Sequence, residues 1–165
     1  GGFDRLCAGV PGSPSTEELR AAGTKGTLFV HEILTVRPGS ALDFLAAAAE
    51  QRKPLMAEYD HVATGLYEVT SNQHEVVMVW ATDIPSQVRL RQNRDTTRGL
   101  CTEGEADDRI VEWERTSAQF VTGGDTHLMT PLPRTVYGPD DWEDATLDQW
   151  LEASGTVLPG ADSDD

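Results

Sequence analysis

Apolar residues are concentrated in the middle of the chain, where they form four short runs. Residues 28–36 and 62–70 are rich in β-branched and aromatic residues, and the run 75–81 is apolar at every position after its first residue. Such runs are typical of β-strands. The short polar stretch between the second and third runs predicts a β-hairpin. A fourth strand is expected at 126–130.

The stretch after the first strand predicts a helix with one buried face. Ser40 is expected to cap its start. Pro54, whose ring nitrogen carries no proton, is expected to bend or restart this helix. Spacing predicts an apolar stripe on its core-facing side, formed by Leu42, Leu45, Ala46 and Ala49.

Two further helices are predicted between the third and fourth strands. Asp83 is expected to cap the first of them, which runs to about Arg98. Apolar residues at helical spacing over 110–121 predict the second, and the pair of glycines that follows is expected to end it. The acidic stretch 99–107 is expected to be the loop between them.

The predicted order of strands and helices is that of a ferredoxin-like α+β domain. The order βαββαβ gives an antiparallel sheet with helices on one face. We assign this domain to residues 27–133. Residues 1–26 form an N-terminal appendage with one short helix that Ser15 caps, and residues 134–165 carry a C-terminal helix near 140–153 and an acidic tail.

The third strand indicates that both faces of the sheet are covered. A strand with one solvated face alternates apolar and polar residues, whereas 76–81 is apolar throughout. Because helices cover only one face of this fold, a second copy of the chain is expected to cover the other. The sequence therefore predicts a homodimer, a dimeric α/β barrel with roughly eight central strands.

The charge of the chain excludes two classes of partner. Its 165 residues include 13 Lys and Arg against 28 Asp and Glu, so the formal net charge is −15 at pH 7. Binding to duplex nucleic acid or to an anionic membrane surface requires the opposite sign. We therefore expect neither a nucleic acid nor a membrane as partner.

The cysteines and the hydropathy pattern indicate a cytoplasmic protein. Cys7 and Cys101 are far apart in the sequence and belong to no CxxC pair, which favours free thiols in a reducing compartment, with a long-range disulfide as the alternative. The chain has no run of about 18 apolar residues, and its start has no apolar signal segment.

Several segments resemble the NIPSNAP family of the dimeric α/β-barrel superfamily. The matching segments are Thr35-Val36-Arg37-Pro38-Gly39, then 75–83 with Arg89 and Arg91 after it, and 128–133. The resemblance covers about residues 27–133 and implies the ferredoxin-like fold and a dimer. The wider superfamily includes cofactor-independent monooxygenases, isomerases, polyketide cyclases and haem-dependent enzymes, so the resemblance leaves the reaction open.

Glu32 is the first candidate for acid–base chemistry. Strand alternation places it on one face with Leu28, Val30, Leu34 and Val36, where it is the only polar residue. Burial among apolar groups raises the pKa of a carboxyl group, which suits a general acid or base near neutral pH. The alternative is a structural ion pair, for which the second helix offers Arg89, Arg91 and Arg94.

The opposite face of the first strand carries His31. His127 on the last strand is a candidate neighbour, and together the two imidazoles would form a proton-transfer pair; the alternative is ordinary packing. Tyr67 and Trp80 on the hairpin are candidates for the wall of a small-molecule pocket, or ordinary core residues. Met78, on the face of Trp80, and Arg91, which offers a charge to an anionic ligand, complete the predicted binding set.

The sequence has no motif for a bound cofactor or metal. It lacks a phosphate-binding glycine loop, a nucleophile elbow and a zinc-ligand spacing. His61 and His74 lie at strand ends and are expected to be exposed. We therefore expect no cofactor, with haem bound through one histidine as the alternative.

These observations favour an enzyme that acts on a small, largely apolar organic molecule without a cofactor. The expected reaction is an isomerisation, a cyclisation or an oxygenation of the kind found in biosynthetic tailoring, with Glu32, His31 or His127 moving the proton. The alternative is a non-catalytic NIPSNAP-like domain that binds a ligand or a protein. Its acidic loop and its C-terminal tryptophans Trp142 and Trp150 would then contact the partner; the other expectation for the tryptophans is that they fold back to cover the core.

Overall fold

The structure, a computed structural model, describes residues 5–132, 135, 137–138 and 146. The predicted C-terminal helix, the acidic tail and both C-terminal tryptophans lie outside the described residues.

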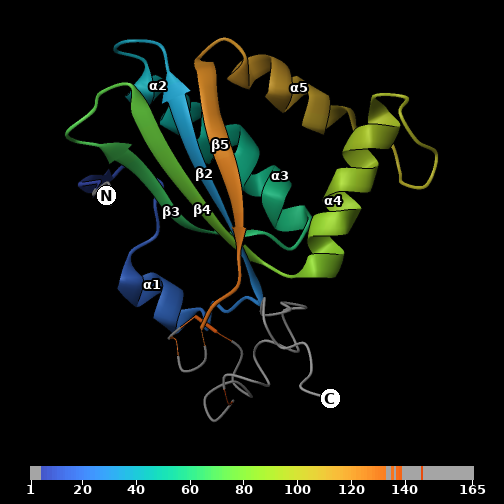
Figure 1. The fold of residues 1–165 in the computed structure, drawn as a ribbon, viewed down its shortest axis with the longest axis horizontal. Coiled ribbons are helices and arrows are strands. Elements are labelled where there is room, and N and C mark those ends of the chain that lie inside the picture. Colours follow the sequence, from blue (N-terminus) through green and yellow to red (C-terminus); the bar gives the residue numbers. More distant parts are fainter. Residues whose placement is uncertain (1–4, 133–134, 136, 139–145, 147–165) are drawn as a thin grey trace, which may run out of the picture.

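A five-stranded antiparallel sheet forms the centre of the fold (Figure 1). Its strand order is β1-β3-β4-β2-β5, and the four predicted strands occupy the positions of a ferredoxin-like sheet. The fifth, β1, was not predicted because it is only three residues long and fully exposed, and it extends the sheet beyond β3. The strands are β1 (Cys7–Gly9), β2 (Leu28–Val36), β3 (Val62–Val69), β4 (Glu75–Thr82) and β5 (Val121–Met129).

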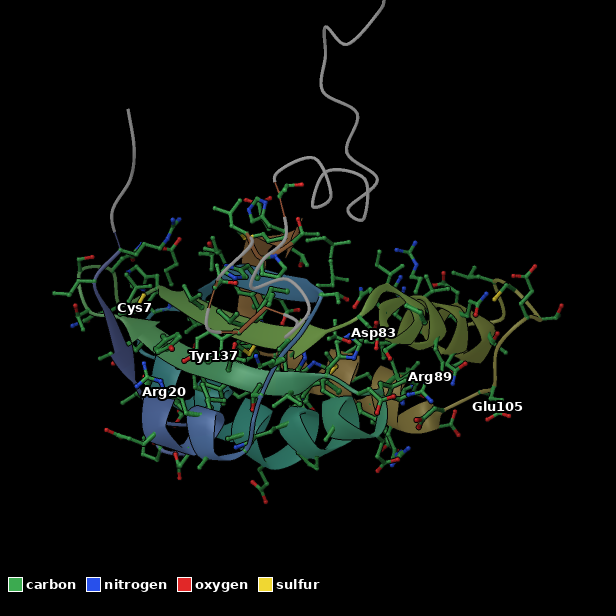
Figure 2. The ribbon with its side chains drawn as sticks, turned by 90° about the horizontal axis from the view of Figure 1, so that it is seen from below. Cys7, Arg20, Asp83, Arg89, Glu105 and Tyr137 are labelled. Carbon is green, nitrogen blue, oxygen red and sulfur yellow. The ribbon has the colours of Figure 1, made fainter. Side chains whose placement is uncertain are left out.

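Helices α2 and α3 run along one face of the sheet. Helices α4 and α5 lie on the side of the sheet that ends with β5 (Figures 1 and 2). Phe44 of α2 packs against the rings of Trp113 and Phe120, at centroid distances of 5.8 and 5.9 Å. The helices are α1 (Thr16–Ala21), α2 (Ala41–Ala47), the π-helix η1 (Ala48–Arg52), α3 (Lys53–Glu58), α4 (Ile84–Thr97) and α5 (Asp108–Ser117).

The predicted caps are confirmed at two of three helices. Ser15 forms a capping box with Glu18, and the side chain of Asp83 accepts a hydrogen bond from the backbone of Ser86. Ser40 is the N-cap residue of α2, as predicted, but its side chain does not cap the helix, because its hydroxyl donates to the carbonyl of Arg37, 2.7 Å away. That bond closes the preceding turn instead of capping α2.

The predicted stripe of α2 is rotated by about one residue. Leu42 and Ala46 are exposed, whereas the buried positions are Ala41, Phe44, Leu45 and Ala48. The aromatic ring of Phe44 decides this rotation, since it buries far more apolar area than an alanine and finds aromatic partners.

The predicted change in the helix at Pro54 is confirmed: a π-helix, η1, precedes α3 there. Pro54 lies in the first turn of α3, where its missing N–H costs nothing. Before it, the chain forms the π-helix η1, a wider turn that is common at functional sites. Ala48 and Arg52, the two ends of η1, both face inward: Ala48 is fully buried and Arg52 reaches the sheet.

Strand β5 begins five residues earlier than predicted, and the glycine pair lies inside it. Helix α5 already ends at Ser117. Gly124 has a φ of 142°, and a Cβ there would lie 2.4 Å from the carbonyl oxygen of Ile33. The glycines therefore allow β5 to approach β2 closely beside the irregularity at Thr35/Val36, rather than ending a helix.

The face of the sheet opposite to α2 and α3 is partly covered by the chain itself. Residues of the segment 14–19 and Tyr137 line one cavity together with the sheet residues Phe29 and Val79. Strand β4 is therefore buried on both faces over most of its length. A second copy is not needed to bury β4, while β5 is exposed along almost its whole length, and the homodimer stays a prediction.

Replacing Gly124 with alanine is expected to destabilise the protein by about 2 kcal/mol, because the new Cβ meets the backbone of β2 and the φ is unfavourable. The matched control is Gly123→Ala, where a Cβ meets nothing within 4 Å. Urea unfolding of both variants measures the difference. Equal free energies of unfolding for the two variants would contradict the close approach of the strands.

Candidate functional site

A cavity of about 660 Å³ lies between the sheet and the helices α4 and α5. Strand β2 contributes Glu32 to its wall, flanked by Val30 and Leu34. The apolar part of the wall also includes Leu55, Leu90, Ile110 and Trp113, and helix α4 adds the polar side chains Gln87, Arg91, Arg94 and Arg98. The volume lies in the range of small-molecule sites.

Both oxygens of the Glu32 carboxylate have protein partners. Arg52 donates from Nη2 to Oε1 over 2.6 Å, and the indole nitrogen of Trp80 donates to Oε2 over 2.8 Å. Glu32 is buried, as strand alternation predicted. Both carboxylate oxygens thus act as acceptors, and Glu32 forms a structural ion pair with Arg52.

Arg52 is the centre of this cluster. Its guanidinium carbon lies 5.3 Å from the ring centroid of Trp80 and 5.5 Å from that of Trp113, so two cation–π contacts add to the ion pair. Only 14% of its side chain is exposed. Its Nε is buried and has no hydrogen-bond partner in the part of the chain that the structure describes.

The alternative of a structural ion pair for Glu32 is thus the arrangement observed, but with a different partner. The predicted partners Arg89, Arg91 and Arg94 lie on α4, and none of them contacts Glu32. Arg52 comes from η1, twenty residues after Glu32, because the wide π-turn directs its side chain toward β2.

The arginines of α4 lie around the cavity with part of their surface free. Arg94 donates to Asp95 and has 30% of its side chain exposed, and Arg91, which also pairs with Asp95, is 66% exposed. The guanidinium groups hold the pKa of Asp95 below its usual value. Arg98 pairs with Glu114 across the gap to α5. Four arginines and two glutamates thus line the cavity, a positive local balance within a chain of net charge −15.

The acidic loop between α4 and α5 is attached to α4 by side chains. Asn93, Thr96 and Thr97 accept hydrogen bonds from backbone N–H groups of the loop at Glu105, Gly104 and Asp107, respectively. Figure 2 shows Glu105 on this connection, at the opposite end of the molecule from Cys7. The loop is therefore held against α4 up to Asp107, the residue that caps α5.

The structure brings His31 and His127 together on the other face of the sheet. The two residues are direct cross-strand partners of β2 and β5. Burial, with a smaller contribution from His127, holds the pKa of His31 below its usual value. His31 lines a separate cavity of about 240 Å³ with Tyr67 and Thr64.

The predicted site residues therefore divide between two faces. Glu32, Trp80, Met78 and Arg91 belong to the helix side of the sheet, and Tyr67 belongs to the side of the two histidines. The expectation that Tyr67 and Trp80 shape one pocket is wrong for this reason. Trp80 and Met78 are fully buried core residues.

Three features of the site were not predicted. The role of Arg52 was not predicted, and the only sequence signal near it is the expected helix break at Pro54. The role of Trp113 was not predicted either, because the apolar spacing over 110–121 indicates only that it is on a helix. His61 was expected to be exposed, and that expectation is wrong: it is fully buried, 2.7 Å from the carbonyl oxygen of Tyr59 and 2.8 Å from the side-chain oxygen of Gln87.

The described part of the chain offers little to a metal cofactor in the large cavity. No histidine or cysteine is among the described residues that line it. Residues 5–132 and the few described after them contain no group of three or more side chains suited to hold a metal ion. Cys7 and Cys101 are both free. No helix among the described residues is long and apolar enough to cross a membrane.

The fold is similar to that of a solved NIPSNAP domain protein. An uncharacterized NIPSNAP domain protein from Burkholderia xenovorans has a TM-score of 0.50 and 16% identity, over 68% of this chain and 99% of that one. A NIPSNAP family protein from Agrobacterium tumefaciens has a TM-score of 0.49 and 13% identity, over 68% and 97%. No protein-family model and no curated protein matches the sequence. The ferredoxin-like fold that the sequence resemblance implied is therefore confirmed as a NIPSNAP-like fold.

Replacing Arg52 with methionine is expected to destabilise the protein by about 3 kcal/mol, because Glu32 is left as an unpaired buried charge. The double variant with Glu32→Gln is expected to recover at least about 1 kcal/mol of this loss. Urea unfolding of the four proteins in the cycle measures the coupling. The control is Arg89→Met, which breaks an exposed pair with Asp60 and is expected to cost less than about 1 kcal/mol. Strictly additive effects would contradict a structural Glu32–Arg52 pair.

The imidazole of His31 is expected to titrate below the ordinary histidine pKa of about 6.5. Since the unfolded chain then binds the proton more tightly than the folded one, stability is expected to fall as the pH drops from about 6.5 through the folded pKa. NMR titration of the ring protons measures the pKa directly, and His127→Ala is expected to raise it. A His31 pKa at or above 6.5 would contradict its burial.

Proposed function

We propose that this domain binds a small organic molecule with an apolar body and an anionic group in the cavity between α4, α5 and the sheet. The observation that supports this most directly is the cavity of about 660 Å³ with arginines on one wall and apolar side chains on the other. An apolar wall supplies binding free energy, and a few charged groups orient the ligand.

The arginines favour an anion over a neutral ligand. Arg91, Arg94 and Arg98 line the cavity, and each pairs with Asp95 or Glu114. A guanidinium group has five N–H donors, so an arginine in such a pair has further donors for a ligand. Arginine is the residue best suited to planar carboxylate groups, because its donors form a rigid fork. A small organic acid therefore fits this wall better than an alcohol or an amide.

A second cavity, of about 470 Å³, is less suited to a ligand. It lies between residues 12–24, α3 and β3. Its ionisable groups are already engaged: Lys53 donates to the carbonyl of Gly12, Glu18 belongs to the capping box, and His61 is held on both ring nitrogens.

Acid–base catalysis on the bound molecule, as an isomerase, cyclase or oxygenase, is the second candidate. The observation in its favour is that the Glu32 carboxylate lies in the cavity wall. Against a role as proton carrier stand its bonds to Arg52 and Trp80, which would have to be given up or shared on protonation. We therefore favour ligand binding without catalysis over acid–base catalysis as the function of this domain.

The cytoplasmic location and the homodimer that the sequence predicts are part of the same proposal. The free thiols Cys7 and Cys101 fit a protein of the cytoplasm. The exposed strand β5 and the half-covered face beside it fit contact with a second copy of the chain. Neither is required for ligand binding.

The test is a calorimetric titration with a set of aromatic and alicyclic carboxylic acids, each paired with its primary amide. At least one acid is expected to bind, and more tightly than its amide. Leu90→Trp, which fills the cavity, is expected to abolish binding, whereas Leu42→Trp on an exposed position of α2 is expected to leave it unchanged.

Arginine variants separate the anionic group from the apolar body. Arg94→Gln is expected to weaken binding of the acid about tenfold, because a charge-assisted hydrogen bond contributes roughly 1.5 to 3 kcal/mol. Arg89→Gln, on the same helix but outside the cavity lining, is the control. The proposal fails if no acid binds, or if acids and amides bind equally well.

A further inference from the structure

His31 and His127 form a side-by-side pair on the face of the sheet that does not contain Glu32. They are register partners in adjacent antiparallel strands, so both side chains point to the same face. The Cβ atoms of such partners lie about 4.5 to 5.5 Å apart. At that separation, two imidazole rings can direct one nitrogen each toward a common point.

The ring nitrogens of this pair have no hydrogen-bond partner in the part of the chain that the structure describes. Neither imidazole has a hydrogen bond to another of the residues that the structure describes, in contrast to His61, which is bonded on both nitrogens. His31 is half-buried beside Phe29 and Val79, and the adjoining cavity of about 240 Å³ has room for further ligands such as water.

We propose that His31 and His127 together bind one divalent first-row transition-metal ion. Imidazole nitrogens suit zinc, nickel and copper ions, which they bind at about 2.0 to 2.1 Å. Metal binding requires the unprotonated ring, and burial of His31 favours that form at neutral pH. The net charge of −15 attracts cations to the surface of the protein.

The surroundings define what kind of site this is. On β4, His31 has Val79 as its register partner, which offers no ligand. On β5, Asp125 shares the face of His127 but pairs with Ile33, two residues further along β2 than His31. No third ligand joins the two rings among the described residues. One copy of the chain thus supplies two ligands from its described residues, so we expect weaker binding than at a four-ligand structural zinc site.

This site is independent of the proposed ligand cavity. The sheet separates the two, since Glu32 and His31 point to opposite faces of β2. Loss of the histidines is therefore expected to leave binding of organic acids unchanged, and filling the cavity with Leu90→Trp is expected to leave metal binding unchanged.

The test is titration of tag-free protein with nickel ions, followed by calorimetry. Nickel is preferred to zinc as the probe because the exposed thiol of Cys7 attracts softer ions. His127→Ala is expected to weaken binding at least about tenfold, and so is His31→Ala. The control is His74→Ala, which removes an exposed histidine from the hairpin turn.

A second readout tests whether the ion joins the two strands. Binding to the folded state alone raises the melting temperature with ligand concentration, so nickel is expected to stabilise the wild type and the His74 variant but not the His127 variant. Because His127 is exposed, its replacement is expected to leave the fold intact, which circular dichroism checks. Equal nickel affinity in the wild type and in the double variant His31→Ala/His127→Ala would overturn the proposal.

Discussion

The buried ion pair between Glu32 and Arg52 is the interaction on which the arrangement of this domain depends. A carboxylate on the apolar face of a central strand is tolerated only with a cation and further hydrogen bonds around it. Arg52 supplies the charge, Trp80 supplies an indole N–H, and Trp113 covers the guanidinium from α5. One small cluster therefore joins β2, β4, η1 and α5.

This cluster also determines what the neighbouring cavity is able to do. Because Glu32 is committed to Arg52 and Trp80, the groups left for a ligand are mainly the arginines of α4 and the apolar wall. The loop 99–107 is bonded to Asn93, Thr96 and Thr97 of α4, and Arg98 of α4 pairs with Glu114 of α5. The site is thus better suited to holding an anion than to moving a proton.

Much of the fold could be predicted from the sequence, because hydrophobic periodicity is a local property. Strand β2 with Glu32 on its apolar face, the hairpin and the restart at Pro54 all followed from short-range patterns. The partner of Glu32 did not, since the direction of Arg52 depends on a π-turn that has no sequence signature of its own. Strand register could not be predicted either. The pairing of His31 with His127 depends on the register of β5 against β2. The opposite orientations of Tyr67 and Trp80 depend on how the irregular β3 pairs with β4.

Ligand binding in this cavity is tested most directly by a crystal structure of the protein purified from a host in which its natural ligand is available. We expect electron density for a small organic molecule between α4, α5 and β2, with its acidic group toward the arginines of α4 and with Glu32 still bonded to Arg52. A cavity closed by side chains of α4 and α5, or an Arg52 released from Glu32 in the ligand-free protein, would contradict this expectation.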